Sequence, residues 1–233
     1  MRGILLDLDG TLLDIDLSSF LGRYFDALSR TLLSLGTQID SADEAQRAVH
    51  VATEAMMRPH TGLTNREVFN AEFKAVTGID LNDHAEVFER FYAEEFPLMG
   101  DGYGPAPGAH ELIGAALNAG LRIAIATNPI FPRQAVIHRM DWAGLDPTDF
   151  EVITSYETME ACKPHGAYFT QTAHALGVEP QECLMVGDDR VLDLAAADVG
   201  MRTYYVGNHS DACADFHGDL VALARLLPQL VER

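Results

Sequence analysis

Near its start the chain reads Gly3-Ile4-Leu5-Leu6-Asp7-Leu8-Asp9-Gly10-Thr11-Leu12, a short apolar run that turns abruptly acidic. A run of this length and composition predicts a buried parallel strand. Because side chains alternate along a strand, we expect Asp7 and Asp9 on the same side, at the carboxyl end where open α/β sheets bind ligands. Two carboxylates at one such place require a cation or a proton.

Four further apolar runs predict strands at residues 121–127, 152–155, 183–187 and 203–207. Amphipathic stretches of helix length lie between the predicted strands, at residues 108–119, 133–142, 167–176 and 192–199. This alternation predicts an α/β protein with a doubly wound, Rossmann-like parallel sheet and helices on both of its faces.

The segment between the first and second strands is too long for a simple crossover. Residues 16–99 show helical spacing of their apolar side chains and no convincing strand, whereas a crossover needs only about a dozen residues. The sequence therefore predicts a core of residues 1–15 and 100–233 and an inserted all-helical cap of residues 16–99. The Gly/Pro-rich stretch 100–108 is the predicted return hinge.

The charge of the chain excludes some classes of partner. Among 233 residues, 35 are acidic and 16 basic, so the net charge of -19 argues against binding to nucleic acid or to an anionic membrane surface. A small phosphorylated ligand stays compatible, because a bound cation reverses the field locally. Three widely spaced cysteines indicate reduced thiols, and there is neither a signal peptide nor a long apolar run, so we expect a cytoplasmic protein.

Residues that can bind phosphate follow the second and the third predicted strand. Thr127 and Asn128 follow the second strand and offer a hydroxyl group and backbone amides, although such a turn is also common as plain structure. Lys163 is one of two lysines in the chain, with Lys74, and stands before a proline. A compact ammonium group can neutralise both a carboxylate and a phosphoryl group that is being transferred.

The fourth strand delivers more acidic residues to the same edge of the sheet, in the order Gly187-Asp188-Asp189 and then Asp193. Hard oxygen ligands without a nearby histidine or cysteine favour magnesium over zinc. Asp189 is equally compatible with a helix cap, so either Asp189 or Asp193 is expected to assist Asp188. His209, Cys213 and His217 recur every four residues, but their glycine-rich and polar surroundings predict a loop without a metal.

The order of these residues resembles the four motifs of the haloacid dehalogenase-like hydrolase superfamily. The matching positions are Asp7-Leu8-Asp9-Gly10-Thr11, Thr127, Lys163-Pro164, and Gly187-Asp188 with Asp193. The helical insert is similar to the cap of one subgroup. The resemblance implies a cap that opens and closes, magnesium dependence and phosphoryl transfer. Asp9 is typical of the phosphatases and some phosphomutases, and it argues against dehalogenation.

The resemblance implies a role for each matching residue. Asp7 is expected to attack phosphorus and form an aspartyl-phosphate, and Asp9 to protonate the leaving alkoxide and then activate water. Magnesium is expected at Asp7, the Asp9 carbonyl group and Asp188, with Asp193 orienting the metal site. The equatorial phosphate oxygens are assigned to three further residues, Thr127, Asn128 and Lys163.

The cap is expected to recognise the rest of the substrate. Its stretch of residues 56–66 contains Arg58 and Arg66, which suit a polar small molecule, although a solvated connection between helices would look the same. A phosphomutase of the same fold stays open as an alternative. A phospho-accepting signalling module that does not turn over is opposed by the large insert and by an acceptor on the first strand.

Overall fold

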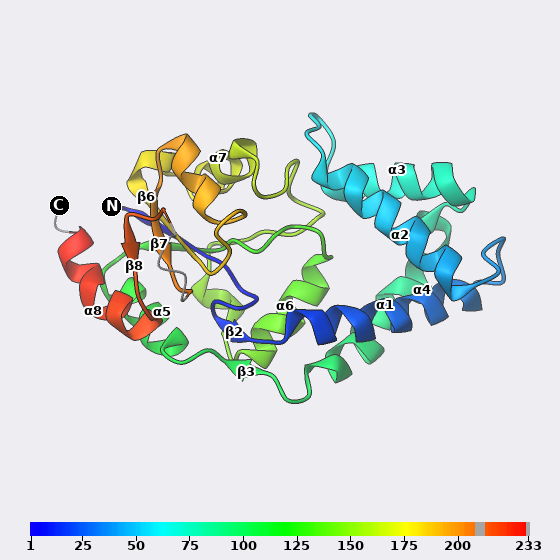
Figure 1. Cartoon of the computed structure of the whole chain (residues 1–233), viewed down its shortest axis with the longest axis horizontal. Coiled ribbons are helices and arrows are strands. Elements are labelled where there is room, and N and C mark those ends of the chain that lie inside the picture. Colours follow the sequence, from blue (N-terminus) through cyan, green and yellow to red (C-terminus); the bar gives the residue numbers. More distant parts are fainter. Residues whose placement is uncertain (208–212, 232–233) are drawn as a thin grey trace.

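The computed structural model describes residues 1–207 and 213–231, and Figure 1 shows its arrangement. The main sheet has the strand order β5-β4-β1-β6-β7-β8, and every neighbouring pair is parallel. The strands are β1 (Gly3–Leu6), β4 (Arg122–Ile125), β5 (Val152–Ile153), β6 (Cys183–Gly187), β7 (Arg202–Tyr205) and β8 (Phe216–His217). The predicted parallel α/β fold is confirmed.

Strand β1 lies in the middle of the sheet and is buried on both faces. Its alternating side chains enter two different cores: Ile4 and Leu6 belong to one apolar cluster and Leu5 to the other. The helices that follow the strands of the core are α5 (Ala109–Asn118), α6 (Arg133–Trp142), α7 (Gly166–Ala175), the 3₁₀ helix η6 (Leu194–Val199) and α8 (Leu220–Val231). Full burial explains why β1 reads as a continuous apolar run.

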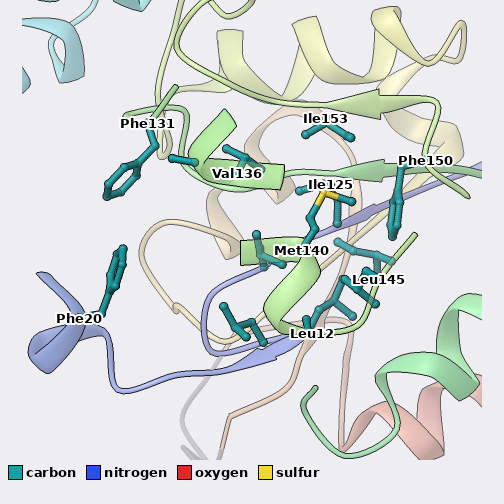
Figure 2. Packing of buried hydrophobic residues seen from close by; sticks show 14 of the residues in the cluster. Leu12, Phe20, Ile125, Phe131, Val136, Met140, Leu145, Phe150 and Ile153 are labelled. Carbon is teal, nitrogen blue, oxygen red and sulfur yellow. The ribbon is translucent and has the colours of Figure 1, made fainter. Parts of the chain in front are cut away.

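Helices cover both faces of the sheet, as predicted. Helices α5 and α8 lie on one side and α7 on the other (Figure 1). On the first side, α6 packs Val136 and Met140 close to Ile125 and Ile153 of the sheet (Figure 2). This packing fixes α6 beside the carboxyl ends of β1 and β4.

The helices between Leu17 and Gly100, within the segment that joins β1 to β4, form the helical insert. Its elements are α1 (Leu17–Ser34), α2 (Ala42–Met57), α3 (Asn65–Thr77), the 3₁₀ helix η1 (Leu81–His84), α4 (Ala85–Arg90), the π-helix η2 (Phe91–Glu95) and the 3₁₀ helix η3 (Phe96–Gly100). Helix α3 begins at a capping box between Thr64 and Glu67 and ends at Gly78, whose φ of 74° favours glycine. The helical nature of the insert agrees with the sequence, while its exact boundaries stay a prediction.

Some elements do not follow from the sequence pattern. Two short strands, β2 (Leu13–Asp14) and β3 (Gly104–Pro105), pair in antiparallel fashion where the chain leaves and re-enters the core. Two-residue strands are too short to show a periodicity. The predicted loop around residue 217 is wrong at His217, which lies in β8, whereas His209 lies outside the described residues.

The loop between α2 and α3 is held against the core. The backbone amide of Asn65 donates to the Met159 carbonyl group (2.8 Å), and its side-chain amide donates to the Pro129 carbonyl group (3.0 Å). The backbone amide of Arg66 donates to the Tyr156 carbonyl group (2.8 Å). The start of α3 is therefore attached to two loops of the core. Within residues 1–207 and 213–231, no helix combines the length and apolar character needed to cross a bilayer.

Candidate active site

Three carboxylates meet at the carboxyl ends of two neighbouring strands. Asp7 directly follows β1 and Asp188 directly follows β6, and the backbone amide of Asp7 donates to the Val186 carbonyl group (2.9 Å). Together with Asp193, each offers one oxygen atom, and these atoms lie within 4.8 Å of one another. Since parallel strands end at the same edge of a sheet, residues that are about 180 positions apart in sequence come together here.

Lys163 is the cation of this cluster. Its Nζ lies 2.7 Å from Asp7 Oδ1 and 2.5 Å from Asp193 Oδ1, and its side chain is 1% exposed. Its backbone amide donates to Asn128 Oδ1 at 3.1 Å, which connects the loop after β4 to the same site. Burial lowers the pKa of Lys163, but the carboxylates of Asp193 and Asp7 outweigh this effect, so the net shift is upward and the amine stays charged.

The cluster contains more negative charge than Lys163 neutralises. Burial raises the pKa of Asp7 well above its ordinary value, Asp193 adds to the rise, and Lys163 opposes it. Burial also raises the pKa of Asp188, and the hydrogen bond that the Thr11 hydroxyl group donates to Asp188 only partly offsets this rise. Three carboxylates facing one ammonium group, with oxygen as the only donor type, form a set that suits a hard divalent cation.

Two glycines make room for these carboxylates. Gly10 has a φ of 85°, and a Cβ atom built on it would lie 2.5 Å from Asp188 Oδ2. A Cβ atom on Gly187 would overlap the carboxylate of Asp193. Both glycines are therefore required by the close approach of the acidic side chains to the backbone, which explains their place in the sequence pattern.

Asp193, and not Asp189, lies with Asp188 in the cluster. Asp193 is buried, and its Oδ2 accepts from the Asp189 backbone amide at 2.9 Å while its Oδ1 accepts from Lys163. Asp189 is exposed and caps the following turn, because its Oδ1 accepts from the amides of Val191 (2.7 Å) and Leu192 (2.9 Å). Both oxygens of Asp193 are already hydrogen-bonded, so this residue is well placed to orient Lys163.

Thr127 lies buried in the loop that follows β4. Its carbonyl group accepts from the hydroxyl groups of Thr154 (2.8 Å) and Tyr168 (2.9 Å). With Asn128 bonded to Lys163, this loop has a fixed backbone beside the acidic cluster. The structure thus brings together Asp7, Asp188, Asp193, Lys163 and Asn128 as the sequence suggests.

Asp9 has a partner that the sequence analysis missed. Its carboxylate pairs with the guanidinium group of Arg139 on α6, whose side chain is 1% exposed, and it is not part of the three-carboxylate cluster. The guanidinium carbon also lies 4.5 Å from the centre of the Phe131 ring. The sequence does contain a signal for such a pair. Arg139 stands on the buried face of α6 with Ala135, Val136 and Met140, where a charge without a partner would be costly.

The two arginines of the cap lie on different surfaces. Arg58 directly follows α2 as its C-cap and is exposed, and its Nη2 lies 3.7 Å from Glu54 Oε2. Arg66 is exposed near the start of α3 and lines a cavity between the cap and the core. In the part of the chain that the structure describes, neither guanidinium group pairs with the acidic cluster.

Comparison with known proteins agrees with this geometry. The chain is 31% identical over 199 residues to a phosphoglycolate phosphatase of Rhodospirillum rubrum, covering 84% of this chain and 75% of the relative. It is 33% identical over 132 residues to the Arabidopsis thaliana protein suppressor of quenching 1, but spans only 12% of that protein's length.

A solved structure extends the likeness to the whole chain. The phosphatase of Thermococcus onnurineus described as a HAD phosphatase is 26% identical, has a TM-score of 0.59, and is matched over 97% of this chain and 98% of its own. The family model described as haloacid dehalogenase-like hydrolase matches residues 1–199. With its motif residues gathered at one edge of the parallel sheet, the chain belongs to the haloacid dehalogenase-like hydrolases.

Proposed function

We propose that this hydrolase is a magnesium-dependent phosphatase that acts on a small phosphorylated metabolite through an aspartyl-phosphate intermediate. The observation that carries the proposal is the cluster of Asp7, Asp188 and Asp193 around the buried Lys163. The names of the related phosphoglycolate phosphatase and HAD phosphatase support the same activity.

In the proposed first step, an oxygen of Asp7 forms a bond to phosphorus while the bond between phosphorus and the leaving oxygen breaks. The electron pair of the broken bond goes to the leaving oxygen, which takes a proton from Asp9. Asp9 then accepts a proton from the water that attacks the aspartyl-phosphate, which releases inorganic phosphate and restores Asp7.

Other residues provide charge and position. Lys163 would stabilise the phosphoryl oxygens, together with Thr127 and the amide of Asn128. Asp7, Asp188 and the Asp9 carbonyl group would hold Mg²⁺, with Asp193 in support. When bound, Mg²⁺ supplies the positive charge that lets a phosphate dianion approach the Asp7 carboxylate.

The proposal is tested by measuring inorganic phosphate released from a panel of small phosphate monoesters, with Mg²⁺ and after exhaustive chelation. We expect turnover of at least one monoester, and chelation should lower the rate by at least about tenfold. Turnover that survives chelation or responds to zinc alone would contradict the magnesium assignment. Transfer of the phosphoryl group to a second sugar phosphate without net release would favour the phosphomutase alternative.

Asp9 is proposed to move protons, and this role predicts a dependence on the leaving group. Asp9 pairs with Arg139 through one oxygen, whereas its Oδ1 is buried without a hydrogen-bond partner among the described residues. Asp9→Asn should slow hydrolysis of alkyl phosphates by about 100-fold, but of aryl phosphates by about tenfold or less, because an aryl oxide needs little protonation to leave. Steady-state rates on matched alkyl and aryl esters measure this difference, and equal losses would argue for a purely structural role.

We further propose a cytoplasmic location. Cys162, Cys183 and Cys213 are free, and the first two are buried. Free cysteines at wide spacing are typical of a reducing compartment.

A further inference from the structure

Arg139 is a cation that the fold encloses almost completely. Its side chain is 1% exposed, and its one ionic partner among the described residues is the carboxylate of Asp9, which is 12% exposed. Burying both charges costs free energy that apolar side chains of similar size would not cost. The pair is therefore weak evidence for a role in stability, and its position at a residue of the candidate active site suggests another reason for it.

Three contacts fix the guanidinium group of Arg139. Nη1 donates to Asp9 Oδ2, and Nε donates to the Ala135 carbonyl group one helical turn earlier on α6 (3.4 Å). The Phe131 ring lies against the group, with its centre 4.5 Å from the guanidinium carbon. Because α6 is itself packed against the sheet, Arg139 presents Nη1 to Asp9 from a fixed position.

The backbone of Asp9 is fixed separately, by the turn that follows β1. The Gly10 amide donates to the Leu13 carbonyl group (2.9 Å), and the Leu13 amide donates to the Leu8 carbonyl group (2.8 Å). These bonds hold the main chain but leave the carboxylate of Asp9 a choice of side-chain rotamers. Among the described residues, Arg139 is the group that donates to this carboxylate, so it determines the direction of the side chain.

The two oxygens of the Asp9 carboxylate have different surroundings. Oδ2 accepts from Arg139, whereas Oδ1 is buried and accepts no hydrogen bond within residues 1–207 and 213–231. Asp9 is close enough to Asp7 to contribute to the raised pKa of that residue. It is nevertheless not one of the three carboxylates whose oxygens lie within 4.8 Å of one another. Asp9 thus lies beside the acidic cluster, with one oxygen bound to Arg139 and the other without a partner.

We propose that Arg139 is a positioning residue for Asp9, which binds one carboxylate oxygen and keeps Asp9 out of the acidic cluster, so that Oδ1 stays available to the substrate. This inference rests on the proposed phosphatase function, in which Asp9 passes a proton to the leaving oxygen. Without Arg139, the Asp9 carboxylate would turn towards a divalent cation bound at the cluster, because such cations take carboxylate oxygens as ligands. Asp9 would then bind metal and no longer serve the leaving group.

A double-mutant cycle on ester hydrolysis tests this role. Arg139→Met should slow hydrolysis of alkyl phosphates at least about 30-fold but that of aryl phosphates about threefold or less, the same selectivity that we expect for Asp9→Asn. In the Asp9→Asn background the same change should cost less than about threefold on either ester, because residues that act as a unit are not additive. Equal losses on both esters, or losses that multiply with that of Asp9→Asn, would overturn the proposal.

A conservative variant guards against a failure to fold. Arg139→Lys keeps the charge but not the shape of the guanidinium group, so it should keep at least about a tenth of the wild-type rate on alkyl phosphates. Thermal unfolding identifies a variant that does not fold. If Arg139→Met is such a variant, Arg139→Lys takes its place in the cycle, with an expected loss of about threefold to tenfold that disappears in the Asp9→Asn background.

Arg122 provides a matched control for the substitution. Its Nε lies 2.9 Å from Glu151 Oε2, at the start of β4 and therefore at the opposite end of the sheet from Asp9. Arg122→Met should keep the wild-type ratio of alkyl to aryl rates. If it changed this ratio as much as Arg139→Met does, the selectivity would not depend on Asp9 and the proposal would fall.

A metal titration distinguishes failure of this inference from failure of the proposed function. The probe is Mn²⁺, because it takes the same oxygen ligands as Mg²⁺ and its free form is measured by electron paramagnetic resonance. Arg139→Met should bind Mn²⁺ at least about tenfold more tightly than the wild type, since one more carboxylate reaches the cation, but less than about threefold more tightly in the Asp9→Asn background.

The rate cycle decides where phosphate esters are hydrolysed, and the Mn²⁺ titration decides where they are not. If no ester is hydrolysed but the expected difference in Mn²⁺ affinity is found, the positioning role of Arg139 stands and the catalytic proposal falls. If no ester is hydrolysed and the effect of Arg139→Met on Mn²⁺ affinity is the same with and without the Asp9 carboxylate, the positioning role is overturned as well.

Discussion

Replacing Asp7 by asparagine is expected to lower kcat by at least about 1,000-fold on every phosphate ester that the wild type hydrolyses. The change keeps the size of the side chain but removes the carboxylate oxygen that would form the bond to phosphorus. Folding should be preserved, because the amide oxygen of asparagine can still accept a hydrogen bond from Lys163 and Lys163 keeps its contact with Asp193. Single-turnover phosphate release measures the loss, and thermal unfolding checks the fold.

The same variant tests the covalent intermediate. Wild-type protein that is acid-quenched during turnover should contain a peptide with one added phosphoryl group at Asp7, and the Asp7→Asn protein should lack it. Asp189→Asn is a matched control, because Asp189 is exposed and outside the cluster, and it should keep both turnover and the labelled peptide. A nucleophile elsewhere is required if Asp7→Asn keeps a tenth of the wild-type rate.

Replacing Lys163 by methionine is expected to lower kcat/KM by about 100-fold to 1,000-fold, the range for removal of a charged group that stabilises the transition state. It should also lower the free energy of unfolding by about 3–5 kcal/mol in the absence of metal, because the carboxylates of Asp7 and Asp193 are left buried without their cation. Urea unfolding and steady-state kinetics measure the two effects separately. Added Mg²⁺ should restore part of the stability but little of the turnover.

The second lysine of the chain provides the matched control. Lys74 forms an ion pair with Asp80 at 2.8 Å, but its side chain is 57% exposed. Lys74→Met should therefore leave both the free energy of unfolding and the turnover nearly unchanged, because a solvent-exposed ion pair contributes little. Equal losses of stability in the two variants would show that the buried cluster does not depend on Lys163.

Much of the core and of the acidic cluster could be predicted because the relevant signals are local in sequence. Each of the five predicted strands overlaps an observed one, and Asp7 and Asp188 directly follow β1 and β6. Once strands are known to be parallel, residues at their carboxyl ends must share one edge of the sheet. The sequence analysis expects Lys163 to neutralise a carboxylate without naming which one, and the structure shows that its Nζ lies 2.7 Å from Asp7 Oδ1.

The features that were missed depend on packing between segments far apart in sequence. The pair between Asp9 and Arg139 joins residues 130 positions apart, and the local sequence around either residue does not identify its partner. The cavity between the cap and the core exists because side chains from several helices leave a space. A sequence pattern shows which positions face inward, but it cannot distinguish a filled interior from a hollow one. Helix α8 (Leu220–Val231) also escaped prediction, and Pro228 interrupts its helical pattern.

The central place of β1 has a consequence for biosynthesis. Its hydrogen-bonding neighbours are β4, which begins at residue 122, and β6, which begins at residue 183. At a ribosome speed of about 5–20 residues per second, β1 waits roughly 9–35 s for its second neighbour. The helices of the insert contact one another at short sequence separation, so we expect them to fold in this interval. Strand β1 is apolar on both faces and has no neighbour to pair with during that time, so it is the segment that a nascent-chain chaperone would shield.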